Sequence, residues 1–184
     1  RAGVSAMNTI HYMHDKYAYE KSQMALHDTE VRRLMAFGIA GMSCMADSLS
    51  AIKYAKVKPI RNPENGIIVD FEIEGDFPKF GNDDDYVDEI AKRLFDSYAA
   101  GVRRQNEDRL PKTRYVDNVF SYNMHITLGE SLGATANGRS AGEAISDCVG
   151  PTQGADTEGS TALLNSVLKL SHKDVTGAHA LNFK

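Results

Sequence analysis

The chain has 184 residues, of which 42% are hydrophobic and 25% are charged, and its formal net charge is −4. This length suits one domain with a hydrophobic core. The mild negative charge is atypical of a nucleic-acid-binding protein, and no apolar run is long enough to span a membrane as a helix. The two cysteines, Cys44 and Cys148, lack the spacing of a metal-binding motif, so the alternatives for them are two free thiols or one disulfide.

Three helices are predicted in the first third of the chain from the intervals between apolar residues. The expected ranges are 4–16, a second helix from 28 to the glycines at 38 and 41, and a third at 47–58. The second helix carries Leu34 and Met35 in its apolar stripe, and the third carries Met45, Leu49 and Ile52. These stripes predict the face that each helix buries.

A strand is predicted over residues 67–74, after a turn-rich stretch at 62–66, because apolar and acidic side chains alternate along it. The remaining expected elements are a loop at 75–81, a helix at 84–103 with its apolar stripe at Val87, Ile90, Leu94 and Tyr98, a strand at 116–122, a glycine-rich irregular stretch at 129–159, a helix at 160–170 and a short strand near 180–183. Together these elements predict a mixed α/β fold in which helix predominates. So long an irregular stretch is expected to pack against chain outside this sequence.

The histidines offer one candidate metal site. His11 and His14 are three residues apart, so they share one face of the predicted first helix. The zinc-protease pattern requires a spacing of four with a glutamate between the histidines, and that pattern is absent. We therefore predict packing histidines, with Asp15 as a hydrogen-bond partner for His11, and no metal site.

Three other candidates have structural alternatives. The acidic run at 82–85 lacks the ligand spacing of a calcium loop and is predicted to cap the helix that follows and to match its dipole. Cys44 lies among methionines and is predicted to be a buried packing residue. His27, beside Asp28, is a candidate acid–base residue, with helix capping by Asp28 as the alternative. No nucleotide-binding loop or serine-nucleophile motif occurs.

In the first half of the chain, the stretch at residues 46–61 and several shorter ones resemble the pyruvate formate-lyase family. The longest matching stretch is ADSLSAIKYAKVKPIR at residues 46–61. The other matching stretches are 10–17, 19–20, 24–28 (which includes His27), 38–41, 70–75, 78 and 80–82. Matches of this length and order make the resemblance over residues 8–82 highly specific.

The second half of the chain resembles the wider glycyl-radical enzymes, and its sequence is closer to the dehydratase and lyase branches. The segment GATANGRSAGE at residues 133–143 carries the family's Asn-Gly-Arg pattern as Asn137, Gly138 and Arg139. We expect structural roles for these residues, with Arg139 fixing a loop through its several donors and Gly138 supplying a positive φ angle. Further matches lie at 151–154, 159–162 and 166–170.

The resemblance implies a ten-stranded α/β barrel around a cysteine loop and a glycyl-radical loop. It implies the conversion of pyruvate and coenzyme A to acetyl-CoA and formate in anaerobic cytoplasm. The radical is installed by an activating enzyme that uses an iron–sulfur cluster and S-adenosylmethionine, and the parent enzyme is expected to be a homodimer. Coenzyme A serves as its co-substrate.

The residues of that chemistry have no counterparts in this sequence. It has no adjacent cysteine pair and no glycine followed by tyrosine. We therefore expect residues 1–184 to be an internal part of the catalytic domain, with the cysteine loop before it and the glycine loop after it, and without an initiator methionine or a signal peptide. The isolated chain is predicted to be inactive, with no catalytic residue assigned. The alternatives are a segment of another glycyl-radical lyase or dehydratase, and a non-catalytic assembly subunit.

Overall fold

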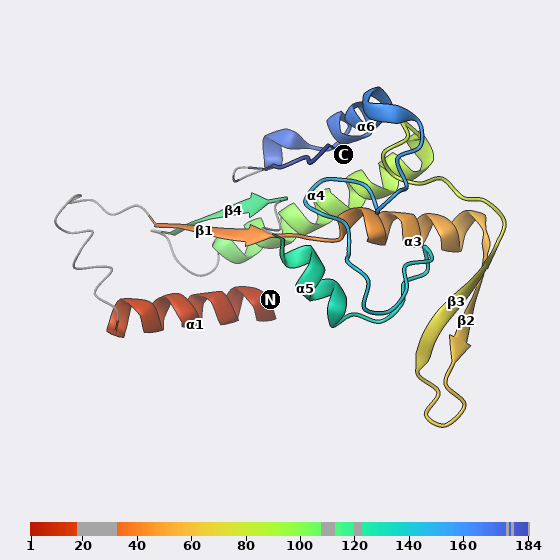
Figure 1. The fold of residues 1–184 in the computed structure, drawn as a ribbon. Coiled ribbons are helices and arrows are strands. Elements are labelled where there is room, and N and C mark those ends of the chain that lie inside the picture. The colour runs from red at the N-terminus through yellow and green to blue at the C-terminus, as the bar shows by residue number, and fades with distance from the viewer. Residues whose placement is uncertain (18–32, 108–112, 120–122, 176, 178, 184) are drawn as a thin grey trace.

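The computed structural model describes residues 1–17, 33–107, 113–119, 123–175, 177 and 179–183, and its elements confirm the expected α/β class (Figure 1). In chain order they are helix α1 (Ala2–Tyr17), strand β1 (Arg33–Gly38), helix α3 (Met42–Tyr54), strands β2 (Lys56–Arg61) and β3 (Ile68–Glu74), helix α4 (Asp85–Glu107), strand β4 (Thr113–Asn118), helices α5 (Met124–Glu130) and α6 (Gly159–Leu168), and the 3-10 turn η1 (His172–Asp174). No helix within these residues is long and apolar enough to cross a bilayer.

The strands form two separate pairs. β1 and β4 are parallel, with Met35 opposite Tyr115, and β2 and β3 form an antiparallel hairpin. The sequence-based prediction of a helix through Leu34 and Met35 is wrong, because β1 pairs with β4 along its whole length. In the strand these two neighbours point to opposite faces, so Met35 is buried and Leu34 is exposed. The start of that expected helix lies outside the described residues.

Helix α3 begins at Met42, earlier than predicted, and buries the face opposite to the one that its apolar stripe predicted. Met45, Leu49 and Ile52 are all exposed. The buried face is made mostly of small residues: Met42, Ser43, Cys44, Ala46, Asp47, Ser50 and Ala51. Small side chains allow α3 to lie close against α4, and this close packing decides which face is buried. The helix ends at Tyr54 because the next residues pair with β3.

Helix α4 confirms the strongest helical pattern in the sequence and extends to Glu107. Of its predicted stripe, Val87 is fully buried, and Ile90 and Leu94 pack partly buried against the same core. The main core contains these residues: Met42, Ala46, Phe80, Val87, Ala91, Phe95, Val119, Val149, Leu163, Val167 and Leu170. A smaller cluster joins α1 to the parallel pair through Val4, Met35, Val102 and Tyr115.

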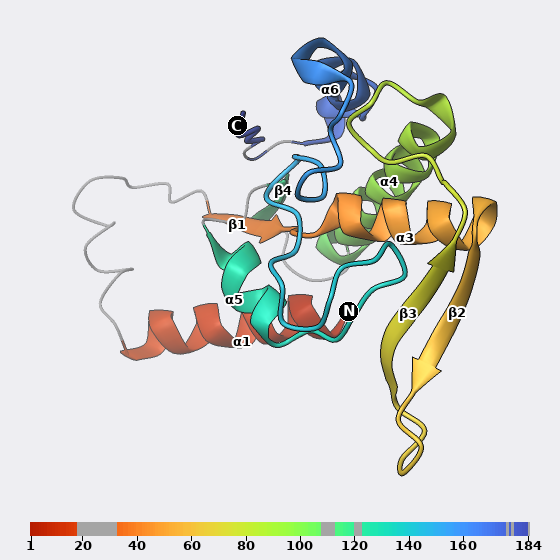
Figure 2. The ribbon, with the colours of Figure 1, turned by 45° about the vertical axis from the view of Figure 1, so that its right-hand side comes forward.

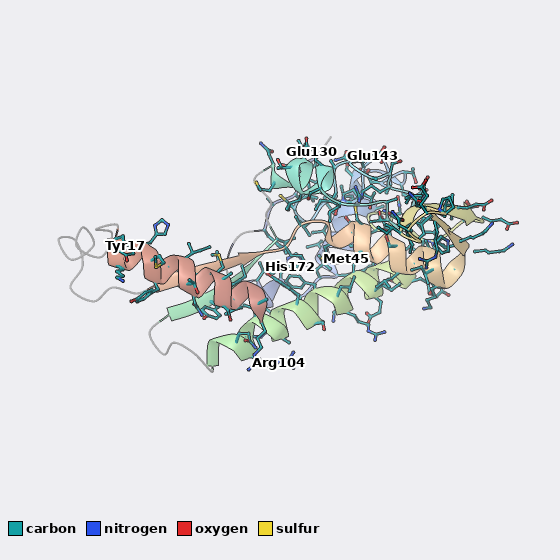
Figure 3. The ribbon with its side chains drawn as sticks, turned by 90° about the horizontal axis from the view of Figure 1, so that it is seen from below. Tyr17, Met45, Arg104, Glu130, Glu143 and His172 are labelled. Carbon is teal, nitrogen blue, oxygen red and sulfur yellow. The ribbon has the colours of Figure 1, made fainter. Side chains whose placement is uncertain are left out.

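The predicted strand at 67–74 is confirmed as β3, but the first half of its partner β2, residues 56–58, was predicted as helix. The hairpin of these two strands stands clear of the helical body (Figure 2). Helix α5 was not predicted. Its end lies against residues 143–144, near Glu130 and Glu143 in Figure 3. This close approach is possible because Gly129 has no side chain; a Cβ atom there would clash with the Glu143 carbonyl.

The last elements agree in part with prediction. Helix α6 lies within one residue of its expected start. β4 covers only the first part of the strand expected at 116–122, and residues 120–122 lie outside the described part of the chain. The strand expected near 180–183 is absent from the described residues there, and a single bridge joins His179 to Val119 instead.

Candidate functional site

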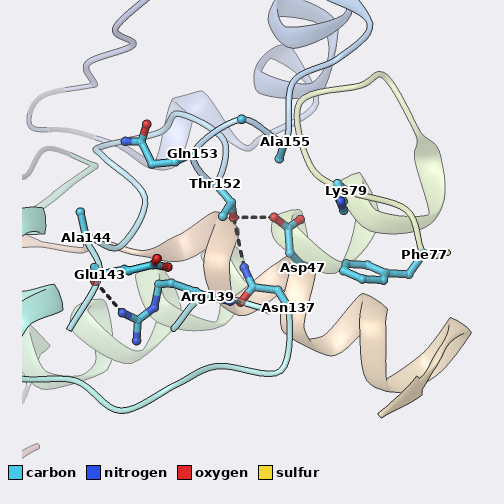
Figure 4. A pocket seen from close by; sticks show the side chains of 12 residues that line it. Asp47, Phe77, Lys79, Asn137, Arg139, Glu143, Ala144, Thr152, Gln153 and Ala155 are labelled. Carbon is cyan, nitrogen blue, oxygen red and sulfur yellow. Dashed lines mark hydrogen bonds between the residues drawn. The ribbon is translucent and has the colours of Figure 1, made fainter. Parts of the chain in front are cut away.

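A pocket of about 370 Å³ opens between α3, the loop after β3 and the glycine-rich stretch that follows α5 (Figure 4). Its polar lining includes Asp47 from the helix, Lys79 from the loop, and Asn137, Arg139 and Thr152 from the glycine-rich stretch. Three segments that are far apart in the sequence therefore meet at one place. Neither cysteine lines the pocket.

The carboxyl group of Asp47 is the most unusual group at this pocket, because the side chain is only 1% exposed. Its Oδ1 accepts a hydrogen bond from the backbone N–H of Phe80 at 2.7 Å, and its Oδ2 accepts one from the Thr152 hydroxyl at 2.5 Å. Burial raises the pKa of Asp47 to about 6, although these two hydrogen bonds and the charge of Lys79 act in the opposite direction. The carboxyl can therefore take up a proton under mildly acidic conditions.

The polar contacts continue from Thr152 into the glycine-rich stretch. The Asn137 amide donates to the Thr152 hydroxyl at 3.4 Å and its oxygen accepts from the Thr135 hydroxyl at 2.6 Å, so Thr152 connects Asn137 to Asp47 (Figure 4). We call Asp47, Phe80, Thr152 and Asn137 the Asp47 joint. It joins the glycine-rich stretch to α3 through hydrogen bonds.

The expected structural roles of Arg139 and Gly138 are confirmed. The Arg139 guanidinium donates to the backbone carbonyls of Ser140 at 3.1 Å, of Glu143 at 2.5 Å and of Gly133. Gly138 has a φ angle of 94°, which favours glycine. Arg139 thus closes the loop on itself by satisfying its carbonyl groups.

A second polar cluster, which we call the Lys169 clasp, joins α6 to the start of α4. The Lys169 ammonium lies 2.7 Å from Asp83, 2.8 Å from Asp85 and 2.8 Å from Asp88. The Ser166 hydroxyl also donates to Asp88 at 3.0 Å. Burial opposes the charge of Lys169, but the hydrogen bonds to these carboxylates outweigh it and raise the pKa of the ammonium.

The acidic run at 82–85 therefore does more than the predicted capping. Asp84 makes a capping contact, since its Oδ1 accepts the N–H of Tyr86 at 2.9 Å, and Asp85 lies in the first turn of α4. Asp83 binds Lys169 and Asn165 instead, and these hydrogen bonds lower its pKa. The sequence pattern showed the acids but not the lysine that they hold.

The other sequence candidates have structural settings or lie outside the described residues. Cys44 is buried as predicted, and its sulfur accepts the N–H of Ser146 at 3.2 Å. Neither cysteine is in a disulfide, which decides against the disulfide alternative. His11 and His14 lie on α1, and no cluster of three metal-ligating side chains occurs in the part of the chain that the structure describes. His27 and Asp28 lie outside the described residues.

Sequence reasoning missed Asp47 and the histidine pairs. His125 lies 3.3 Å from Asp147, and His172 lies 2.9 Å from His179. One signal for Asp47 was available, because an acid within a run of small residues on a buried helix face requires hydrogen-bond partners. Chemically, the pocket offers a carboxyl that can hold a proton beside several hydrogen-bond donors.

Three comparisons with known proteins bear on this arrangement. Residues 1–129 match the family described as pyruvate formate lyase-like. The chain is 47% identical over 169 residues to "Formate acetyltransferase 1" of Escherichia coli, which covers 91% of this chain and 22% of that protein. The chain thus spans about a fifth of the length of this relative.

Solved structures resemble the fold. The B12-independent glycerol dehydratase from Clostridium butyricum matches 79% of this chain and 20% of its own, with a TM-score of 0.63 and 27% identity. A glycyl radical enzyme from Archaeoglobus fulgidus matches 80% of this chain and 20% of its own, with a TM-score of 0.65 and 23% identity. The second likeness concerns the fold alone.

Proposed function

Because the chain belongs to the pyruvate formate lyase-like family, we propose that it is a segment of a formate acetyltransferase, which converts pyruvate and coenzyme A to acetyl-CoA and formate. The observation that carries this proposal is the 47% identity to the Escherichia coli formate acetyltransferase over 169 residues. Since the segment spans about a fifth of that relative, the activity belongs to the parent enzyme and the segment contributes part of its framework.

The parallel β1–β4 pair supports a place within a larger sheet, in our proposal the ten-stranded barrel of glycyl-radical enzymes. Parallel sheets in proteins are covered on both faces. In this pair Met35 and Tyr115 are covered by α1 and α4, whereas Leu34 on the other face is 64% exposed. Further strands beside this pair, and a layer over Leu34, would complete the structure.

The proposed role of the segment is to hold loops in place. The Asp47 joint fixes the glycine-rich stretch on α3, and the carbonyl contacts of Arg139 fix its shape. Both thiols of this chain are buried and neither lines the pocket, so they do not fit the role of a substrate-facing thiyl. We propose that the cysteine loop, the glycyl-radical loop and the coenzyme A contacts lie elsewhere in a homodimeric, cytoplasmic parent enzyme, which a radical S-adenosylmethionine enzyme activates.

A second candidate is a segment of a glycyl-radical dehydratase. It is favoured by the likeness to the glycerol dehydratase and by the sequence of residues 133–170. The identity to that dehydratase is 27%, compared with 47% to the acetyltransferase, so the acetyltransferase is the stronger candidate.

A chimeric enzyme tests the proposal. The corresponding segment of the Escherichia coli formate acetyltransferase is replaced by this chain, and the purified chimera is activated and supplied with pyruvate and coenzyme A. We expect formate production within about tenfold of the unmodified enzyme, because the segment supplies the framework and leaves the reacting groups untouched. The matched control carries the corresponding segment of the glycerol dehydratase and is expected to lose activity.

Two readouts separate folding from chemistry. The amount of radical stored after activation, measured by electron paramagnetic resonance, reports a correctly assembled chimera. A chimera that stores the radical but forms no formate contradicts the acetyltransferase assignment. Formate production by the isolated 184-residue chain would contradict the prediction that this segment is inactive alone.

A further inference from the structure

Away from the pocket, the structure brings two imidazole rings into direct contact at the C-terminal end of the chain. The Nδ1 atoms of His172 and His179 are 2.9 Å apart, and the rings are nearly perpendicular. The other nitrogen of His172, Nε2, lies 2.8 Å from the carbonyl oxygen of Val167 at the end of α6. His179 also lies against the ring of Phe95 from α4.

These contacts assign the protons of both rings. A carbonyl oxygen only accepts, so Nε2 of His172 carries a hydrogen, and Nδ1 of the neutral ring is an acceptor. Nδ1 of His179 must then be the donor between the rings. This leaves Nε2 of His179 as a bare nitrogen, and it is buried with no partner among the described residues. A proton added to Nε2 of His179 would find no acceptor there, and a proton added to Nδ1 of His172 would place two N–H groups face to face between the rings.

The pair holds a short piece of chain, residues 179–183, which we call the strap. A backbone bridge joins His179 to Val119 at the end of β4, and the N–H of Ala180 donates to the Val119 carbonyl at 3.3 Å. The Ala180 carbonyl in turn accepts the N–H of Val149 at 3.2 Å. The strap therefore lies between Val119, just after β4, and Val149 within the glycine-rich stretch.

We propose that the His172–His179 pair is a pH-sensitive latch, which holds the strap on β4 while both rings are neutral and releases it when the pair takes up a proton. The geometry supports this directly, because the hydrogen bond between the rings and the one to Val167 form together in only one neutral arrangement. A charged ring would be buried without a hydrogen-bond partner, which is strongly unfavourable.

Burial and the neighbouring histidine set the sign of the response of the latch to pH. Burial first, and the charge of His172 second, lower the pKa of His179 below its ordinary value of 6.5. The open strap therefore binds protons more readily than the closed one. The closed form is fully favoured above about pH 6.5 and loses this advantage as the pH falls through the lowered pKa.

The neighbouring elements carry other charged groups. On α4, Asp96 accepts hydrogen bonds from Ser171 and Lys92, and on η1 Lys173 is exposed. On the far side of the strap, Asn182 donates to Asp147, which also contacts His125.

Amide hydrogen exchange in the full chain tests the latch. Exchange rates at pH 7.5 and pH 5.5, corrected for intrinsic chemistry, give the protection of the amide of Ala180. We expect that protection to fall at least tenfold at the lower pH, while the amide of Phe95 in α4 keeps its protection. Equal protection of Ala180 at both pH values would overturn the proposal.

A variant and its control assign the effect to the latch. His179→Leu places an apolar side chain in the same apolar setting, and we expect its Ala180 protection to be the same at both pH values. The matched control His14→Leu, on the exposed part of α1, is expected to keep the tenfold fall. A fall in Ala180 protection that persists in His179→Leu would overturn the proposal of a latch.

Nitrogen chemical shifts of the unsubstituted chain give a second measurement, independent of any variant's folding. At pH 7.5 we expect the proton on Nε2 of His172 and on Nδ1 of His179. The opposite tautomer on His179 would contradict the proton assignment and with it the latch. Neither outcome depends on the reaction that the parent enzyme catalyses.

Discussion

The Asp47 joint and the Lys169 clasp both fix the second half of the chain to helices of the first half, but they treat a buried carboxyl group differently. Asp47 and Asp88 are each about 1% exposed. Asp47 has hydrogen-bond donors in contact and no ion pair with any described residue, whereas Asp88 has an ammonium group at 2.8 Å. The joint is therefore sensitive to whether its carboxyl is charged, and the clasp to whether its lysine is present.

Burial raises the pKa of both carboxyls, so burial alone does not distinguish them. The distinction lies in what can compensate the negative charge. Neutral donors stabilise a carboxylate without cancelling its charge, whereas an ammonium does both. Variants of the two clusters should therefore differ in how their stability depends on pH and on salt.

The largest expected effect is on the pH dependence of the Asp47 joint. Because the pKa of Asp47 is raised from 3.8 to about 6, ionisation of its carboxyl lowers the free energy of unfolding by about 3 kcal/mol. This loss is absent below pH 3.8 and complete above pH 6. Asp47→Asn removes this titration. Relative to the natural chain, the variant should gain about 3 kcal/mol in free energy of unfolding between pH 4 and pH 8, measured with urea.

Asp76→Asn is the control for that comparison, since Asp76 is an exposed acid in the loop near the same pocket. Its stability difference from the natural chain should stay within about 0.5 kcal/mol across the same range. If the difference in free energy of unfolding between Asp47→Asn and the natural chain did not change with pH, the carboxyl would be better solvated than its burial indicates.

The next effect is on the clasp. Lys169→Met removes the cation that three carboxylates share, so we expect a loss of about 2 kcal/mol in the free energy of unfolding at pH 7. The loss should shrink near pH 4, because Asp88, whose pKa is raised by burial, takes up a proton as the pH falls. Lys173→Met, an exposed lysine on η1, is the matched control and should change little. A loss of the same size at both pH values would contradict the ionic description of the clasp.

A smaller effect is expected for the hydroxyl of the joint. Thr152→Val keeps the shape of the side chain but removes the donor to Asp47, and we expect a loss of about 1.5 kcal/mol at pH 8. Thr161→Val, at an exposed position of α6, serves as the control. Urea unfolding at pH 8 and pH 5 checks the value, with a smaller loss expected at pH 5. An equal loss of free energy of unfolding in Thr152→Val and Thr161→Val would show that the hydrogen bond from the Thr152 hydroxyl does not stabilise the fold.

The smallest effect belongs to the exposed ion pair of the hairpin. Lys56 and Glu74 are 2.8 Å apart, but their side chains are 80% and 74% exposed. Lys56→Ala should therefore change the free energy of unfolding by less than about 0.5 kcal/mol. A loss above 1 kcal/mol in thermal or urea unfolding would place the hairpin pair in the same class as the clasp.

Elements with a strong local pattern were predictable from the sequence. Helix α4 has acidic residues at its start and a continuous apolar stripe, and β3 alternates regularly. β1 was mistaken for helix because its partner β4 is far along the chain and short apolar runs fit both states. The face of α3 was wrong for a related reason, since its small residues are buried by α4, which local hydrophobicity does not reveal.

The candidate site was predictable only where a residue acts on its own neighbourhood. The roles of Gly138 and Arg139 followed from family resemblance and from their local chemistry. Asp47 and Lys169 depend on partners from distant segments, and His179 pairs with a histidine 7 residues away; no spacing in the sequence indicates those pairings. Tertiary structure alone brings them together.

The turn at the tip of the β2–β3 hairpin is a suitable site for inserting a tag or label. Its turn is closed by its own contacts: the N–H of Asn62 donates to Ile67 at 2.8 Å, that of Gly66 donates to Asn62 at 2.8 Å, and the Arg61 side chain donates to Gly66 at 2.8 Å. The tip also projects away from the body (Figures 1 and 2). A short epitope or fluorescent label inserted after Glu64 would therefore be displayed to solvent while the helical core and both clusters stay undisturbed.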